Sequence, residues 1–159
     1  MTETAARRIV VGVDGSNASI GALKWAMVKG EELGAVVDVV HCWYPHSLPE
    51  LVFGSGNELR TGSECMLANE VAAATAATGS SATVVTASVK GLPVPVLIAH
   101  AENAELLVLG THGNFGLREL VLGQTAAQVR RKATCPVVVI DADGNEVRTA
   151  GGRQAPAAH

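Results

Sequence analysis

The sequence is poor in aromatic residues and in charge, and it has no long hydrophobic run. Phe, Trp and Tyr make up 3% of the 159 residues and charged residues 17%, whereas apolar residues make up 48%. The core must therefore be aliphatic, and a chain of this length is sufficient for one domain. Because no apolar run approaches the roughly 18 residues that a transmembrane helix needs, we expect no membrane association.

An excess of positive charge is also lacking. The formal net charge is −3 and the pI is about 5.9, so no basic stripe is available to neutralise the phosphates of a nucleic acid. The one basic cluster, at 130–132, falls in the last turn of a predicted helix, where cations complement the helix dipole. We therefore expect no nucleic-acid partner.

Cysteine is scarce, odd in number and without the spacing of a metal site. Of the three cysteines, Cys42 and Cys135 lie in or beside predicted buried strands, where a free thiol behaves as a small apolar group. No secretory signal precedes the first predicted strand. These features predict a cytoplasmic protein.

What the sequence does contain is an alternation of short aliphatic runs and helical periods. Buried strands are predicted at 8–13, 35–42, 82–89, 105–109 and 136–140. Capping residues, apolar periodicity and flanking glycine or proline predict helices at 17–33, 63–78, 93–103 and 123–133. Five strands alternating with four helices predict an open, doubly wound α/β fold with helices on both faces of a parallel sheet.

Three other segments have no sustained period. The segment 43–62 holds two prolines and three glycines, which predicts a long loop. Residues 1–6 and 142–159 are predicted to be flexible ends around a single domain at 7–141.

The stretch that joins the fourth predicted strand to the last predicted helix carries the strongest functional signal. Its glycines stand at 110, 113, 116 and 123. A strand followed by a glycine loop and a helix start turns backbone N–H groups toward an anion, and glycine lets a phosphate approach the backbone. Asp14 follows the first strand, so both features would line one crevice if the two strands are neighbours. The pattern predicts that this loop binds the phosphates of a nucleotide.

Simpler interpretations of the same residues stay open. Asp14 is also suited to an Asx-turn before the first helix, and the glycines are also compatible with plain turns. The spacing Gly-x2-Gly-x9-Gly is neither the Walker pattern nor the dinucleotide fingerprint. His112 is interpreted as a solvated loop residue, and His41 as a packed, hydrogen-bonded histidine.

Several blocks of sequence resemble the universal stress protein family. They are Ile-Val-Val-Gly-Val-Asp-Gly-Ser at 9–16, Val-Val-His-Cys at 39–42, Gly-Leu-Pro at 91–93, Leu-Val-Leu-Gly-Thr-His-Gly at 107–113, Leu-Gly at 122–123 and Cys-Pro-Val-Val-Val-Ile at 135–140. The resemblance covers about 7–141, and the glycine motif is typical of the branch that binds ATP. It implies a Rossmann-like fold with strand order 3-2-1-4-5 and a homodimer formed through the last strand, 136–140.

The resemblance also implies a nucleotide site. Asp14 would accept hydrogen bonds from ribose hydroxyls, the backbone of Cys42 would face the adenine, and N–H groups at 123–125 would bind the phosphates. The implied set is Gly12, Asp14, Cys42, Leu109, Gly110, Thr111, His112, Gly113, Gly116, Gly123, Gln124 and Thr125. The family has Ser or Thr and then Val after the last glycine, so with Gln124 and Thr125 the usual hydroxyl is missing at 124.

No enzyme signature accompanies these residues, since the loop supplies only Glu119 as an acid and no set of metal-binding carboxylates. We expect a stress-response regulator that binds ATP or a related adenine nucleotide, alone or with Mg²⁺, and hydrolyses it slowly at most. The alternative is a structural or interaction dimer on the same fold with a degenerate site, which Gln124 motivates. A true enzyme acting on a small adenylated substrate is the third hypothesis.

Overall fold

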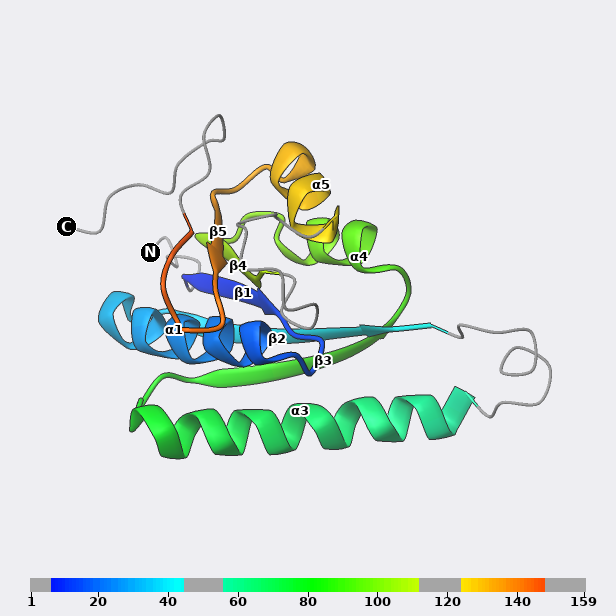
Figure 1. The fold of residues 1–159 in the computed structure, drawn as a ribbon, viewed down its shortest axis with the longest axis horizontal. Coiled ribbons are helices and arrows are strands. Elements are labelled where there is room, and N and C mark those ends of the chain that lie inside the picture. The colour runs from blue at the N-terminus through cyan, green and yellow to red at the C-terminus, as the bar shows by residue number, and fades with distance from the viewer. Residues whose placement is uncertain (1–6, 45–55, 112–123, 148–159) are drawn as a thin grey trace, which may run out of the picture.

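The computed structural model describes residues 7–44, 56–111 and 124–147. Within these ranges, strands and helices alternate along the chain (Figure 1). The strands are β1 (Arg8–Gly12), β2 (Val36–Trp43), β3 (Val84–Lys90), β4 (Leu106–Gly110) and β5 (Val137–Ile140). The helices are α1 (Asn17–Leu33), α3 (Gly56–Thr78), α4 (Pro93–His100) and α5 (Gln124–Lys132).

The five strands form one parallel sheet in the order β3-β2-β1-β4-β5. At its centre, Ile9 of β1 is in register with Val37 of β2 on one side and Leu106 of β4 on the other. The predicted fold class and strand order are confirmed. The strand order reverses between β1 and β4, and in sheets of this kind the crevice for a ligand lies beyond the carboxyl ends of such strands.

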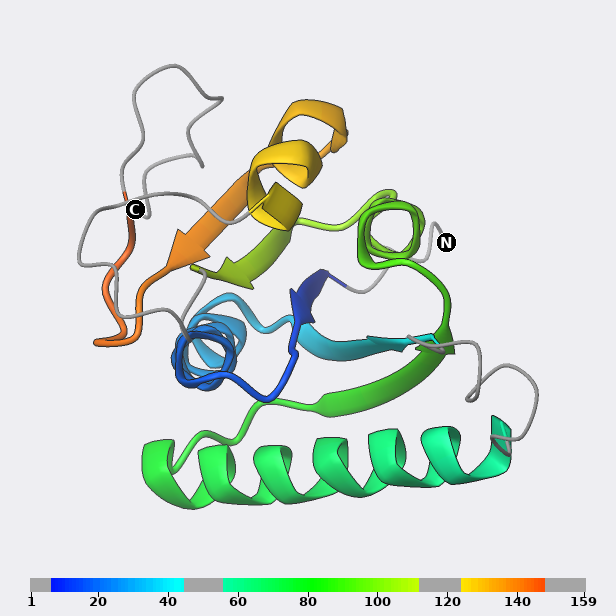
Figure 2. The same cartoon turned by 45° about the vertical axis from the view of Figure 1, so that its right-hand side comes forward.

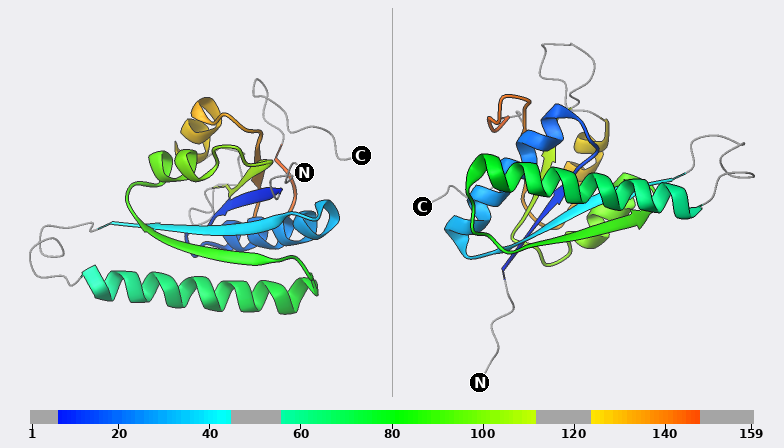
Figure 3. Two further views of the ribbon diagram at one scale, coloured as in Figure 1. Left: turned by 180° about the vertical axis from the view of Figure 1, so that it is seen from behind. Right: turned by 90° about the horizontal axis from the view of Figure 1, so that it is seen from below.

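Helices cover both faces of the sheet. Helices α1 and α3 lie on one face, and α4 and α5 lie on the other (Figures 2 and 3). Alternate residues of one strand serve the two faces: Ile9 and Val11 belong to the core under α1 and α3, whereas Val10 belongs to the core under α4 and α5. This explains why the strands read as continuous apolar runs.

Helix α1 begins and ends where its capping residues predict. The hydroxyl oxygen of Ser16 accepts the N–H of Ser19 at 3.2 Å, and Gly34 takes a left-handed conformation at the end of the helix. Both are standard caps that satisfy backbone groups at helix ends. The helix start, which lies next to the crevice, is therefore fixed by local sequence.

The predicted loop at 43–62 is wrong over much of its described part. Trp43 ends β2, and α3 already begins at Gly56 instead of Ser63. Each glycine in a helix costs only about 1 kcal/mol relative to alanine, and extending an existing helix is cheap. Glu58 in the first turn favours the helix further, because an acid complements the dipole there. Residues 45–55 lie outside the described residues.

Order also continues beyond Asp141, where the sequence predicts a flexible tail. The N–H of Asp141 donates to the carbonyl of Asn145 at 2.9 Å, and the N–H of Val147 donates to the carbonyl of Val139 at 2.7 Å. Residues 145–147 therefore run back along β5, and Val147 is buried. Residues 148–159 lie outside the described residues.

One charged side chain, Asp38 of β2, is buried in the sheet. It is 8% exposed, and its Oδ2 lies 3.2 Å from Nη1 of Arg8 and 3.6 Å from Nδ1 of His100. Arg8 also donates to the backbone carbonyl of Glu102 at 3.0 Å. Because a buried charge without a partner is costly, we infer that this pair ties β1 and β2 to the end of α4.

We expect Asp38→Asn to lower the free energy of unfolding by about 2 kcal/mol, because it leaves the Arg8 guanidinium without its ionic partner. Glu105→Gln is the matched control, since it removes a partner of Arg7 in an exposed pair and should cost about 0.5 kcal/mol or less. Urea denaturation of the two variants measures the difference. If both variants lost the same free energy of unfolding, burial of Asp38 would not determine the strength of its ion pair with Arg8.

Candidate functional site

A cavity of about 150 Å³ lies at the carboxyl ends of β1, β2 and β4, where the strand order reverses. Its wall also includes the loop after β1 and the starts of α4 and α5. It is lined by Gly12, Val13, Asp14, Ser16, Ser19, Val40, Cys42, Pro93, Leu97, Leu109, Gly110, Thr111 and Thr125. The predicted convergence of Asp14 with the end of the fourth strand is therefore present in the fold.

Most of the predicted site residues that the structure describes meet in this cavity. They are Gly12, Asp14, Cys42, Leu109, Gly110, Thr111 and Thr125. Gln124 is the first residue of α5, and His112, Gly113, Gly116 and Gly123 lie outside the described residues. Thr111 and Thr125, which stand on either side of that undescribed segment in the chain, both line the cavity. For all of these residues a role in nucleotide binding stays a prediction.

The loop after β1 holds Asp14 at the cavity wall. Its carboxylate Oδ1 accepts the N–H of Ser16 at 2.9 Å, and its own N–H donates to Oγ of Ser19 at 3.3 Å. This is the Asx-turn that the sequence left as an alternative to ligand binding. Because Asp14 forms this turn and is also an exposed residue of the cavity wall, the two interpretations of Asp14 are compatible.

Gly110 allows the first turn of α1 to approach the end of β4. A Cβ atom at this position would lie 2.6 Å from the carbonyl carbon of Ala18 and 2.7 Å from the backbone nitrogen of Ser19. Real Cβ atoms do not make such contacts with backbone, so any larger residue would push the helix away. The start of α1 borders the cavity because this residue is glycine.

Part of the apolar wall was not among the site residues expected from the sequence, which included only Cys42 and Leu109 of it. The part that was missed includes Val40, Pro93 and Leu97. Val40 and Cys42 lie two apart on β2 and so face the same side of the sheet, which is the signal that could have found Val40. Burial raises the pKa of the Cys42 thiol to about 11, so it stays protonated and acts as apolar lining rather than as a nucleophile.

A second acid, which the sequence did not point to, lies behind Asp14 on α3. A Cβ atom on Gly15 would lie 3.9 Å from Oε1 of Glu70, which places Glu70 against the loop that holds Asp14. Burial and the negative charge of Asp14 raise the pKa of Glu70. The negative charge of Asp14 therefore adds to burial in disfavouring the charged form of Glu70.

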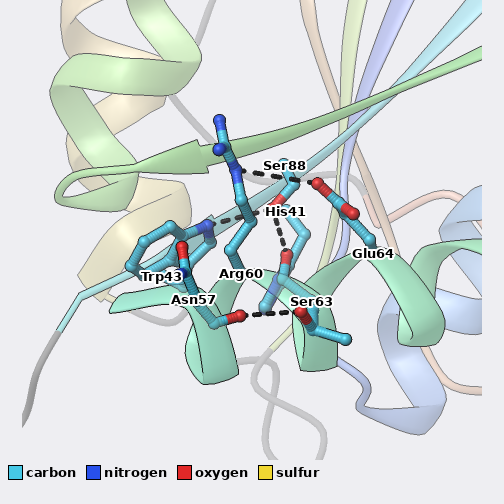
Figure 4. Close-up of polar contacts among 8 residues, drawn as sticks. His41, Trp43, Asn57, Arg60, Ser63, Glu64 and Ser88 are labelled. Atoms are coloured by element: carbon cyan, nitrogen blue, oxygen red, sulfur yellow. Dashed lines mark hydrogen bonds and ion pairs between the residues drawn. The ribbon is translucent and has the colours of Figure 1, made fainter. Parts of the chain in front are cut away.

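A chain of hydrogen bonds joins β2 and β3 to α3 (Figure 4). The indole N–H of Trp43 donates to Oγ of Ser88 at 2.9 Å, Ser88 donates to Oγ of Ser63 at 2.7 Å, and Ser63 lies 2.7 Å from Nδ1 of His41. An indole N–H can only donate, so every group is satisfied when Nδ1 of His41 accepts. His41 is thus a packed, hydrogen-bonded residue, as the sequence predicts.

The fold and the cavity together define an open, doubly wound α/β protein with a crevice at its switch point. The family model described as the universal stress protein family matches residues 5–141. The chain therefore belongs to the universal stress protein family, as the sequence blocks predict.

Some of the proteins with similar sequences are about twice as long as this chain. Universal stress protein Rv2005c of Mycobacterium tuberculosis is 33% identical over 144 residues, which cover 85% of this chain and 48% of the relative. Universal stress protein MJ0531 of Methanocaldococcus jannaschii is 29% identical over 154 residues, covering 87% of this chain and 84% of the relative. The chain thus spans about half the length of the mycobacterial relatives it matches.

Solved structures of the family show the same fold. A universal stress protein in complex with cAMP superimposes with a TM-score of 0.65 at 25% identity, covering 87% of this chain and 99% of the other. The universal stress protein from Archaeoglobus fulgidus in complex with dAMP superimposes with a TM-score of 0.56 at 20% identity, covering 86% and 98%. The second likeness is one of fold alone.

Two further findings concern the part of the chain that the structure describes. None of its helices combines the length and the apolar character that crossing a membrane requires. In the same residues, no group of three or more His, Cys, Asp or Glu side chains is arranged to hold a metal ion.

We expect Gly110→Ala to destabilise the protein by about 1–3 kcal/mol, because the added methyl group must displace the first turn of α1. Gly62→Ala is the matched control: it lies on α3, where an added Cβ meets nothing within 4 Å, and should stabilise by up to about 1 kcal/mol. Thermal or urea unfolding measures both. Equal stability of the two variants would contradict the close approach of β4 and α1.

His41 should make stability fall in mild acid. Burial lowers its pKa below the ordinary 6.5, and the charge of Asp14 only partly offsets this. The unfolded chain then binds the proton more tightly, so the contribution of neutral His41 is complete above about pH 6.5 and is lost as the pH falls below it. In His41→Gln, which keeps an acceptor for Ser63, stability should depend less on pH between about pH 7 and about pH 5.5.

Urea unfolding at several pH values measures this slope. Glu70 has a raised pKa and contributes with the opposite sign, since the folded chain holds its proton more tightly than the unfolded chain does. That contribution is common to both proteins and cancels in the comparison. An unchanged slope in His41→Gln would show that the histidine is not the titrating group.

Proposed function

We propose that this protein binds ATP or a related adenine nucleotide in the cavity at the switch point and acts as a stress-response regulator. The observation that carries the proposal is the meeting of Asp14, Gly110 and Thr125 on one cavity wall. These residues come from three separate segments of the chain, and the crevice rule for open α/β sheets places a ligand at this point.

Different parts of the wall suit the base, the ribose and the phosphates of a nucleotide. Val40, Cys42 and Leu97 offer an apolar surface to the base, and the carboxylate of Asp14 accepts hydrogen bonds from ribose hydroxyls. The phosphates would lie toward the start of α5, where the first N–H groups of a helix have no partner within the helix and the dipole favours negative charge. His112, Gly113, Gly116 and Gly123 complete the proposed phosphate loop together with Gln124.

The size of the cavity agrees with partial enclosure of such a ligand. At about 150 Å³ it is smaller than the roughly 300–1,000 Å³ of pockets that bury a whole drug-sized ligand. We therefore propose that it encloses the base, while the sugar and phosphates lie at its mouth. The cAMP that one solved family member holds supports an adenine ligand.

We propose that any hydrolysis is slow and that Mg²⁺ arrives with the nucleotide. Rapid phosphoryl transfer needs a positioned base and carboxylates that hold metal near the phosphates, and within the described ranges no metal-binding group of three such side chains is present. All three cysteines are free, which supports the reducing cytoplasm as the place of action. A homodimer through β5 is also proposed, from the family resemblance.

We expect the protein to bind ATP in an equilibrium titration and Asp14→Ala to weaken that binding roughly ten- to hundredfold, the effect of losing hydrogen bonds to a charged acceptor. Glu105→Gln is the matched control, because it also removes one negative charge but lies beside the amino end of β4, at the opposite edge of the sheet. The affinity of Glu105→Gln for ATP should equal that of the unaltered protein.

Gly113→Ala tests the phosphate loop in the same titration. Absence of saturable binding at millimolar ATP, AMP and cAMP would overturn the proposal. That result would leave the interaction dimer with a degenerate site as the function to pursue, with partner capture independent of nucleotide.

A further inference from the structure

The outer edge of β5 is partly covered by the residues that follow it, 141–147, which we call the return segment. Because the carbonyls of Pro136 and Ile140 accept hydrogen bonds from the β4 side, the alternation of a strand directs the backbone groups of residues 137, 139 and 141 to the outer edge. The carbonyl of Val139 is taken by Val147, and the N–H of Asp141 is taken by Asn145. In the described chain, the outward groups of Val137 and the N–H of Val139 are not covered in this way.

The turn that produces this cover is built by specific residues. One carboxylate oxygen of Asp141 accepts the N–H groups of Asp143 at 3.0 Å and Asn145 at 2.9 Å. Gly144 takes a left-handed conformation with φ +85°, which other residues adopt only at a cost. An added Cβ on Gly144 would meet nothing within 4 Å, so glycine is needed there for its backbone conformation alone.

The return segment is also anchored at both ends. Its turn rests on α1, where a Cβ atom on Gly21 would lie 3.0 Å from the carbonyl oxygen of Asp141. At the other end, Val147 is 8% exposed and packs in the core beneath α4 and α5. Covering an edge in this way prevents unwanted strand pairing.

We propose that residues 141–147 form a releasable cap on β5, so that a second copy of this chain pairs with that strand only after the cap has opened. The partner follows from the chemistry of the edge: a second β5 offers the same row of N–H and C=O groups, and an antiparallel pair of identical strands satisfies both rows. The inference rests on the proposed homodimer and is independent of nucleotide binding.

Gly144→Val tests the cap by loosening its turn without touching the core. A residue other than glycine disfavours the left-handed conformation by a factor of roughly five to thirty, and two copies must open to form one dimer. We therefore expect the dimer dissociation constant of the full chain, measured by sedimentation, to fall at least fivefold. Hydrogen exchange of the peptide 136–141 should slow as the concentration rises.

Gly79→Val is the matched control. Gly79 follows α3, has φ +65° and has nothing within 4 Å of an added Cβ, so it carries the same backbone cost away from β5. It should dimerise like the unaltered chain. If Gly144→Val does not fold, Asp141→Ala replaces it. This variant removes the carboxylate that accepts the N–H groups of Asp143 and Asn145, and we expect the same fall in the dimer dissociation constant.

The outcomes separate the cap from the dimer. Equal dissociation constants for Gly144→Val and the unaltered chain, with exchange at 136–141 slowed by concentration in both, would overturn the cap and leave the dimer. Dimers without slowed exchange at 136–141 would place the second copy elsewhere and overturn both. Proteins that stay monomeric at every concentration would also overturn both.

Discussion

The close approach between the backbone at the end of β4 and the first turn of α1 is the constraint on which the site depends. It exists because residue 110 has no side chain and residues 18 and 19 occupy the space that one would fill. With α1 held there, its capping residues Ser16 and Ser19 become part of the cavity wall. The Asx-turn of Asp14 is then fixed between a strand end and a helix start. The strand order allows a crevice at this point, and the position of α1 determines the shape of its wall.

The end of β2 supplies two different environments because successive side chains point to opposite faces. Cys42 faces the cavity and contributes apolar surface, whereas His41 faces α3 and completes the hydrogen-bond chain from Trp43. The two environments are coupled by the negative charge of Asp14. Asp14 lies close enough to His41 to raise its pKa against the larger effect of burial, and close enough to Glu70 to add to the effect of burial there. The electrostatics of the site therefore extend through the sheet to α3.

The features that could be predicted from the sequence are those that local residue patterns and the order of the strands determine. Continuous aliphatic runs and helix caps were sufficient for the fold class. The strand order was implied by the family resemblance, and it is this order that makes β1 and β4 neighbours and brings Asp14 and Gly110 together. The start of α3 could not be predicted, because Gly56 and Gly62 look like loop residues and the helix overrides their low propensity. Glu70 was missed because its neighbour Asp14 is remote in sequence. Val147 was missed because a single buried apolar residue has no period.

Helix α1 contacts both the end of β4 beside the cavity and the return segment on β5. Its first turn, at residues 18 and 19, supports the end of β4 beside the cavity, and one turn further on Gly21 supports the return segment on β5. A packed helix moves as a rigid element, and packed interfaces shift between discrete arrangements rather than deforming smoothly. The cavity wall and the cover of the sheet edge therefore share one support, and a displacement of the start of α1 alters both contacts together. Helix α1 thus connects the cavity physically with the outer edge of β5, and no intervening domain is needed.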